Sequence, residues 1–183
     1  MGTRNLTCVY IDGQYKVAQY GQWDGYPSGQ GINLLNILKG LNLEKLREAA
    51  RKCRFLTKDE INELADDEKW LEKYPQLSRD HGANIVKLVY ENNGLTLHNQ
   101  IKFAADSLFC EWAYVVDLDK NLLEVYKGFN KEPSITAEDR FFFLNEEYDD
   151  NGYYPIKIIA TFDLNHLPDD KQFIDHFKIS EDE

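Results

Sequence analysis

Cysteine and histidine are scarce in this 183-residue chain, which has three of the first and four of the second. Cys8, Cys53 and Cys110 are far apart, odd in number and form no CxxC pair, so we expect neither a disulfide framework nor a zinc site. The histidines show no metal-ligand spacing either. We therefore expect no metal and no cofactor.

Long apolar runs and a net positive charge are also missing. No stretch approaches the roughly 18 consecutive apolar residues of a membrane helix, and the N-terminus lacks the apolar core and cleavage site of a signal peptide. We therefore expect a cytoplasmic location and no membrane partner. The chain has 32 acidic and 21 basic residues, a net charge of -11. Because an acidic surface repels a nucleic-acid polymer, we expect no nucleic-acid partner.

The chain shows no internal repeat and no low-complexity linker, so we expect a single domain over residues 1–183. With 43% hydrophobic residues it is long enough to bury one substantial core. Homo-oligomerisation stays open, because the sequence does not show which of its aromatic residues face outward.

Two strand-like runs flank the dipeptide Asp12-Gly13, which is typical of a type I′ hairpin turn. A two-residue turn places Arg4 opposite Gly21, and a three-residue turn shifts each partner by one. Either register lays the N-terminus beside the glycine-rich stretch 21–31.

Further along, the period of the apolar residues changes twice. Helical patterns predict helices over 31–40, 43–53, from 57 onward with the capping-box sequence TKDE, 78–94, 101–108 and 169–178. Strand patterns predict a second hairpin over 111–129, with its turn at 119–121, and a strand within 153–164. The order predicts an α+β fold: an antiparallel sheet built from the N-terminal hairpin and the later strands, with a mostly helical middle third.

The stretch GQWDGYPSGQG, residues 21–31, is the first candidate site. A glycine-rich loop between a strand and a helix can aim backbone N–H groups at a phosphate. Trp23 and Tyr26 offer flat surfaces for a base, and Asp24 and the flanking glutamine amides can read polar edges. The loop has neither a Walker nor a GxGxxG pattern. The alternative interpretation is a structural loop whose rings pack into the core.

The second candidate is SRDHGA, residues 78–83, at an expected helix start. Arg79 suits a phosphate because its planar fork donates two hydrogen bonds, and Arg4 offers a second fork. Ser78 or Asp80 can instead simply cap the helix. The expected ligand-binding residues are Arg4, Gln22, Trp23, Asp24, Gly25, Tyr26, Ser28, Gly29, Gln30, Arg79, Asp80 and His81.

Catalysis is the rival hypothesis, without assigned catalytic residues. The opening strand, turn, strand and loop are similar in layout to N-terminal-nucleophile hydrolases, in which an exposed terminal Thr, Ser or Cys is the nucleophile. Here Thr3 follows Met1 and Gly2, and Cys8 lies inside a strand, which disfavours that chemistry. A hydrolase would otherwise need Asp24, Asp80 or His81 as acid or base.

Four segments, MGTRN, YGQWDGYPSGQG, SRDHGA and EWAYVVDLD with the following LEVY, resemble a family of small uncharacterised proteins of phages, bacteria and some fungi. The resemblance implies one compact domain and brings no activity or functional residues with it. A phage setting would fit counter-defence by sequestration of a host nucleotide signal. We therefore expect binding of a small phosphorylated ligand, with a hydrolase or an acidic protein-interaction module as the alternatives.

Overall fold

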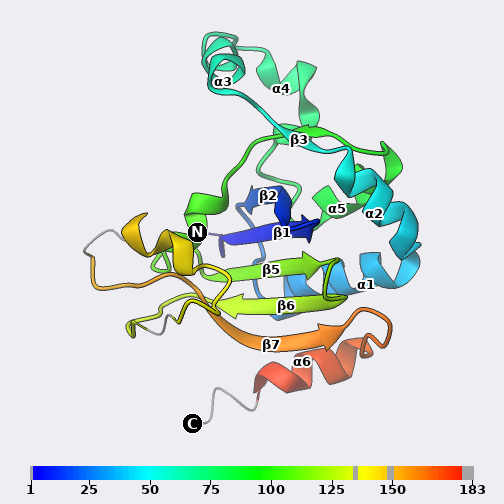
Figure 1. Ribbon diagram of the computed structural model, residues 1–183, viewed down its shortest axis with the longest axis vertical. Helices are drawn as coiled ribbons and strands as arrows, with labels where there is room; N and C mark the ends of the chain where they lie inside the picture. Colours follow the sequence, from blue (N-terminus) through cyan, green and yellow to red (C-terminus); the bar gives the residue numbers. More distant parts are fainter. Residues whose placement is uncertain (1, 134–135, 148–150, 179–183) are drawn as a thin grey trace.

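The computed structural model describes residues 2–133, 136–147 and 151–178. The acidic tail 180–183 and residues 148–150 of the acidic run 145–150 lie outside the described residues. The fold is a mixed α+β arrangement around one five-stranded sheet of order β2-β1-β5-β6-β7 (Figure 1). Its strands are β1 (Asn5–Ile11), β2 (Gln14–Gly21), β5 (Trp112–Asp117), β6 (Leu122–Lys127) and β7 (Lys157–Asp163). Two short strands, β3 (Arg54–Phe55) and β4 (Thr96–Leu97), form a separate parallel ribbon.

The helices follow the sequence prediction closely at both ends of the chain and less closely in the middle. They are α1 (Ile32–Gly40), α2 (Leu43–Arg51), α3 (Lys58–Ala65), α4 (Trp70–Lys73), α5 (Asn84–Glu91) and α6 (Asp170–Lys178). Shorter helical segments are η1 (Pro27–Gly31), η2 (Pro75–Leu77), η3 (Ile101–Ala105) and η4 (Phe142–Glu147). The expected helix over 101–108 is thus only a 3₁₀ turn, and the expected start at 78–81 lies before α5, whose N-terminus carries no side-chain cap.

The sheet is not antiparallel throughout, because β1 and β5 at its centre run parallel. Every residue of β5 is buried, and so are six of the seven residues of β1, as expected for strands covered on both faces. The antiparallel β2 brings the chain back to the end of the sheet where β1 began, since Gly21 lies opposite Asn5, and residues 22–111 lead from there to the start of β5 at the same end. The remaining strand pairs are antiparallel, as the sequence predicts.

Both predicted hairpin turns are present. Asp12 and Gly13 have φ angles of 53° and 72°, in line with a type I′ turn, and the second turn has a positive φ of 56° at Asn121. Next to the turn the register is that of the two-residue turn, with Ile11 opposite Gln14, but at the far end Asn5, not Arg4, lies opposite Gly21. The cause is a bulge between β1 and β2, which shifts every pair beyond it by one residue.

Two layers cover the sheet. On one face, α1, α2, α5 and α6 pack over an apolar cluster that includes Val9, Leu34 and Val116. On the other, η3 and η4 pack over a smaller cluster around Leu6, Ala113 and Phe141. The second layer is thinner and leaves part of the sheet open near the hairpin turns.

None of the helices formed by the described residues combines the length and apolarity that crossing a membrane requires.

Candidate functional site

The glycine-rich loop and the segment SRDHGA lie against each other. The amide of Gln22 donates to the carbonyl of Arg79 at 3.1 Å, and the indole Nε1 of Trp23 donates to a carboxylate oxygen of Asp80 at 3.1 Å. The side chain of Gln30 accepts from the amide of Ala83 at 2.8 Å. The structure therefore brings together two segments that the sequence analysis singled out separately.

The loop amides are largely committed to the protein itself. The amide of Gly25 donates to the Thr3 carbonyl at 2.9 Å, and that of Gln30 donates to the Asp24 carbonyl at 2.8 Å. The amides of Gln22, Gly29 and Gly31 also donate to main-chain carbonyls. An amide that already donates inside the protein cannot also hold a phosphate, so these five form no anion cradle.

The aromatic rings of the loop face outward rather than into the core. Trp23 is 50% exposed and Tyr26 is 53% exposed. The main chain of Arg4 lies beside the loop, as expected, but its guanidinium sits over the ring of Phe109, 4.7 Å from the centroid. Arg79 is exposed, and its guanidinium makes no hydrogen bond or ion pair with any residue that the structure describes.

The remaining predicted residues have local roles or none. His81 Nε2 lies 2.7 Å from the carbonyl oxygen of Pro75, and the amide of Asp80 donates to the Ser78 hydroxyl at 3.2 Å. Asp24 adopts a positive φ of 54° in the turn, and Ser28 is exposed. Among the described residues, no three His, Cys, Asp or Glu side chains are grouped so as to hold a metal ion.

A cavity lies on the open part of the sheet, and none of these residues lines it. It measures about 580 Å³, within the range of small-molecule sites. The sheet forms the floor of the cavity, and residues 137–140, just before η4, form one side. The residues that line it are Tyr10, Gly13, Tyr15, Asp117, Lys120, Leu122, Glu124, Tyr126, Ala137, Glu138, Asp139, Arg140, Phe143, Ile158 and Thr161.

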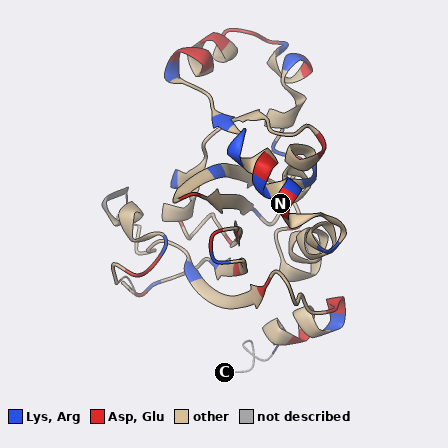
Figure 2. Ribbon diagram, turned by 45° about the vertical axis from the view of Figure 1, so that its right-hand side comes forward, with Lys and Arg blue, Asp and Glu red and all other residues tan. Residues whose placement is uncertain are grey.

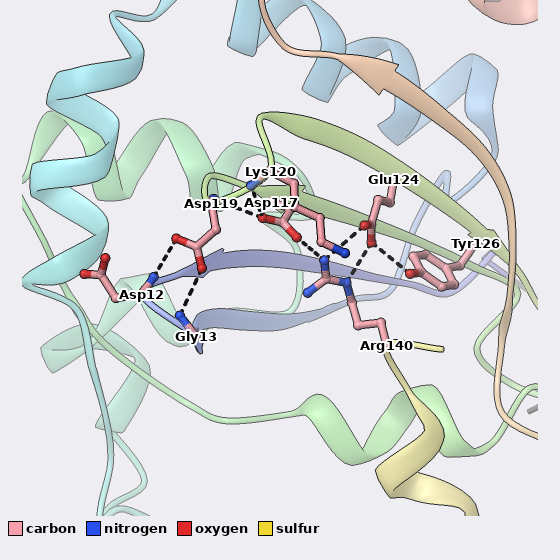
Figure 3. Close-up of polar contacts among 8 residues, drawn as sticks. All are labelled: Asp12, Gly13, Asp117, Asp119, Lys120, Glu124, Tyr126 and Arg140. Carbon is pink, nitrogen blue, oxygen red and sulfur yellow. Dashed lines mark hydrogen bonds and ion pairs between the residues drawn. The ribbon is translucent and has the colours of Figure 1, made fainter. Parts of the chain in front are cut away.

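Arg140 enters this cavity and binds two buried carboxylates of the sheet (Figure 3). Its Nε donates to Glu124 at 2.7 Å, and its Nη2 donates to Glu124 at 3.0 Å and to Asp117. The three side chains are 10%, 6% and 1% exposed, in the order Arg140, Glu124 and Asp117. Tyr126 donates its hydroxyl to Glu124 at 2.8 Å. The site is rigid, because each carboxylate is held by more than one donor.

Asp117 also fixes the turn between β5 and β6, accepting from the amides of Asp119 and Lys120 at 3.0 and 2.8 Å. The Asp119 carboxylate in turn accepts from the amides of Asp12 and Gly13 at 2.8 and 3.0 Å (Figure 3). The two hairpin turns are thereby tied together at the rim of the cavity.

The two edge strands each carry a bulge beside the cavity. In β2 the extra residue is Lys16, so Tyr15 instead pairs with Tyr10 and lies on the cavity face. In β7 the extra residue is Ile159, and Ile158 pairs with Tyr126 on the same face. Bulges redirect side chains in this way and are enriched next to functional sites.

Two polar groups of the cavity wall are not used within the protein. The Tyr15 hydroxyl is buried and has no hydrogen-bond partner among the described residues. Burial raises the pKa of Tyr15, so its hydroxyl stays protonated. In Figure 3 the Nη1 group of Arg140 points away from both carboxylates, and no described residue accepts a hydrogen bond from it. Arg140 Nη1 is thus a hydrogen-bond donor available to a ligand, and the Tyr15 hydroxyl is a second donor without a partner, buried beside the Arg140 guanidinium.

The cavity residues were missed by the sequence analysis. Arg140 lies in the segment 136–140, which has no helical or strand period, and is 16 residues from Glu124 and 23 from Asp117. A local signal existed only for Asp117 and Glu124, which are acids at inward positions of otherwise apolar strands.

Comparisons of the chain with protein-family models, with curated proteins and with solved structures gave no match.

Proposed function

We propose that the protein binds a small polar ligand without phosphate groups, of the size of a nucleoside or a sugar, in the cavity beside Arg140. The observation that carries this proposal is a cavity of about 580 Å³ whose wall holds Arg140, with an Nη1 group from which no described residue accepts a hydrogen bond. A buried donor without a partner costs free energy, and a ligand hydroxyl or carbonyl oxygen would remove that cost.

The rings in the wall favour a flat or cyclic ligand. Tyr10, Tyr15 and Phe143 line the cavity, and the Arg140 guanidinium stacks on Tyr10 at 4.5 Å from the ring centroid. Such surfaces stack well against a base or the apolar face of a sugar. The guanidinium is thus fixed from both sides, by the carboxylates and by the ring.

The charge of the wall disfavours a phosphorylated ligand at this place. Four carboxylates line the cavity, those of Asp117, Glu124, Glu138 and Asp139, against the two cations of Lys120 and Arg140. A phosphate would meet a net negative wall. Because Arg140 already holds the two buried carboxylates, the arrangement suits binding rather than proton transfer.

The phosphorylated ligand expected from the sequence remains a second candidate, at the glycine-rich loop. The observation that favours it is the exposure of Trp23 and Tyr26 in a loop that contacts the main chain of Arg79, whose guanidinium has no partner among the described residues. This surface offers two aromatic rings on which a base can stack and the positive charge of Arg79. Sequestration of a nucleotide signal as a phage counter-defence belongs to this candidate.

One experiment tests both. Thermal unfolding would be followed with a set of nucleosides and simple sugars and with the matching 5′-monophosphates and sugar phosphates. For the cavity, we expect an unphosphorylated compound to raise the Tm of the wild type, since a ligand at 100 times its Kd stabilises by about 2.7 kcal/mol. Thr161→Trp places an indole in the cavity and should abolish that shift.

The matched control is Ile159→Trp, an exposed residue of the same strand that does not line the cavity, which should keep the shift. A Tm shift given only by phosphorylated compounds, and lost in Trp23→Ala and Arg79→Ala, would show that the ligand binds at the glycine-rich loop and not in the cavity. No shift with any compound, or a shift that survives Thr161→Trp, would refute the cavity proposal.

A further inference from the structure

A layer of buried polar side chains lies beneath the glycine-rich loop, on the sheet face that the helices cover. Thr7 of β1 and Gln19 of β2 pair directly across the two strands, and Asn5 lies two residues before Thr7 on the same face. Asn5, Thr7 and Gln19 are 0%, 0% and 1% exposed. Further along the same face the side chains are apolar, with Val9 and Val17 in the core cluster. The polar layer is therefore confined to the end of the sheet under the loop.

Each of these three side chains has one oxygen without a hydrogen-bond partner among the described residues: Asn5 Oδ1, Thr7 Oγ1 and Gln19 Oε1. The side-chain nitrogen of Asn5 donates to the carbonyls of Gly21 and Trp23, at 3.4 and 3.2 Å. That of Gln19 donates to the Ser78 carbonyl at 3.1 Å. Because a carbonyl only accepts, these contacts fix which end of each amide is the oxygen. The unpartnered atoms are thus two acceptors and one hydroxyl.

The same side chains hold the two segments that meet above them. Asn5 binds the carbonyl of Trp23 in the loop, and Gln19 binds the carbonyl of Ser78 at the start of SRDHGA. The loop passes closely over Asn5, since a Cβ at position 25 would lie 3.0 Å from the Cβ of Asn5. A molecule held by the unpartnered oxygens would therefore join the loop, the segment 78–83 and the sheet.

This part of the sheet is nearly free of charge. Strand β1 contains no charged residue and β2 contains only Lys16, so the two strands are mostly tan in Figure 2. The buried carboxylates among the described residues, Asp117 and Glu124, line the cavity on the opposite face and bind Arg140. A cation held by the three oxygens would be buried without a counter-charge, which is costly. The layer therefore selects a small neutral molecule that can donate hydrogen bonds.

We propose that Asn5, Thr7 and Gln19 bind one buried water molecule, which ties the glycine-rich loop and segment 78–83 to the sheet. Water can donate to the two amide oxygens and accept from the Thr7 hydroxyl, which gives the roughly three hydrogen bonds typical of a buried water. A buried polar atom without a partner costs free energy, and a single water satisfies all three atoms. The proposal does not depend on the cavity beside Arg140.

Thr7→Val tests the proposal, because valine has the shape of threonine and lacks its hydroxyl. With the water in place, the variant leaves the water one partner short, and we expect the Tm to fall by at least about 2 °C. Without a water, valine would remove an unsatisfied buried hydroxyl, and the Tm would stay the same or rise. An unchanged or higher Tm would therefore overturn the proposal.

A second measurement observes the water itself, by NMR cross-peaks between water and the side-chain amide protons of Asn5 and Gln19. We expect these cross-peaks in the wild type and in the control Thr7→Ser, which keeps the hydroxyl, and their loss in Thr7→Val. The main-chain amides of Gln22 and Ala83, which join the two segments, should exchange at least about threefold faster in Thr7→Val than in Thr7→Ser.

Two results would refute the water. Absence of the cross-peaks in the wild type would show that the layer is dry. A Tm raised by ammonium chloride, but not by sodium chloride at the same concentration, and no longer raised in Thr7→Val, would show that a cation occupies the layer instead.

Discussion

Arg140 decides the electrostatics of the sheet face that carries the cavity. Without it, Asp117 and Glu124 would be two like charges on adjacent strands, both almost fully buried. A buried charge is tolerated only when it is paired and hydrogen-bonded, and Arg140 supplies both for the two carboxylates at once. The same arginine also shapes the surroundings of Cys8, whose pKa is raised by burial and lowered in part by this positive charge.

We expect Arg140→Met to lower the free energy of unfolding by about 3–5 kcal/mol, because it leaves the two buried carboxylates without a counter-charge. Urea denaturation at neutral pH measures this. The triple variant Arg140→Met, Asp117→Asn, Glu124→Gln should recover a large part of the loss, since no buried charge then remains. The control is Arg51→Met: Arg51 pairs with Asp12 at 2.8 Å on the exposed surface, and its loss should barely move the midpoint. Equal effects at positions 140 and 51 would contradict the assigned role of Arg140.

At the scale of elements, the glycine-rich loop joins β2 to α1 under tight steric limits. A Cβ at position 25 would lie 2.8 Å from the Thr3 carbonyl oxygen and 2.9 Å from that of Arg4. The carbonyl of Gly25 accepts a 2.7 Å hydrogen bond from the buried hydroxyl of Tyr114. The loop therefore passes closely over the start of β1, and glycine is the residue that permits this approach.

We expect Gly25→Ala to destabilise the protein by about 1–3 kcal/mol, because the backbone atoms that its methyl group meets cannot move aside. Gly40→Ala is the matched change: Gly40 lies in the last turn of α1, a Cβ there meets nothing within 4 Å, and alanine should stabilise by about 0.5–1 kcal/mol. Thermal denaturation of both variants measures the difference. A neutral Gly25→Ala would show that the loop has room to relax.

On the scale of the whole molecule, the helices packed on the sheet bury more apolar surface than those of the helical lobe, which is segment 57–77 with α3, α4 and η2. The helix α5 packs Ile85, Val86 and Val89 into the core. The helix α3 has the same length and buries no residue, although its capping box is complete: Thr57 accepts from the amide of Glu60, and Glu60 accepts from that of Thr57. Its N-terminus is satisfied, but its packing is weak.

Native-state hydrogen exchange should therefore show α3 opening at a much lower free energy than α5, although both are eight-residue helices. We expect the amides of α3 to exchange at least a hundredfold faster than those of α5, after correction for intrinsic rates, and the amides of β1 and β5 to be the slowest. If α3 and α5 opened together with the global unfolding of the chain, the lobe would be an integral part of the core instead.

Much of the local structure was determined by the sequence alone. Asp12-Gly13 specified the first turn, TKDE specified the start of α3, and Asn93-Gly94 ended α5, because each acts through its own backbone geometry or through neighbours within a few residues. The mixed α+β character followed from the change of period along the chain. Segment 57–77 shows the limit of that signal, since its apolar spacing predicts helices but does not predict that their apolar faces stay only partly covered.

The tertiary structure alone decided how distant segments meet. The parallel pairing of β1 with β5 depends on the path of residues 27–105, and the bulge at Lys16 depends on the fit of β2 against its neighbours. No period or spacing in the sequence predicts that Arg140 binds Asp117 and Glu124. Contacts of this kind are fixed by the burial of charge and by the closing of long loops, which are properties of the whole packed chain.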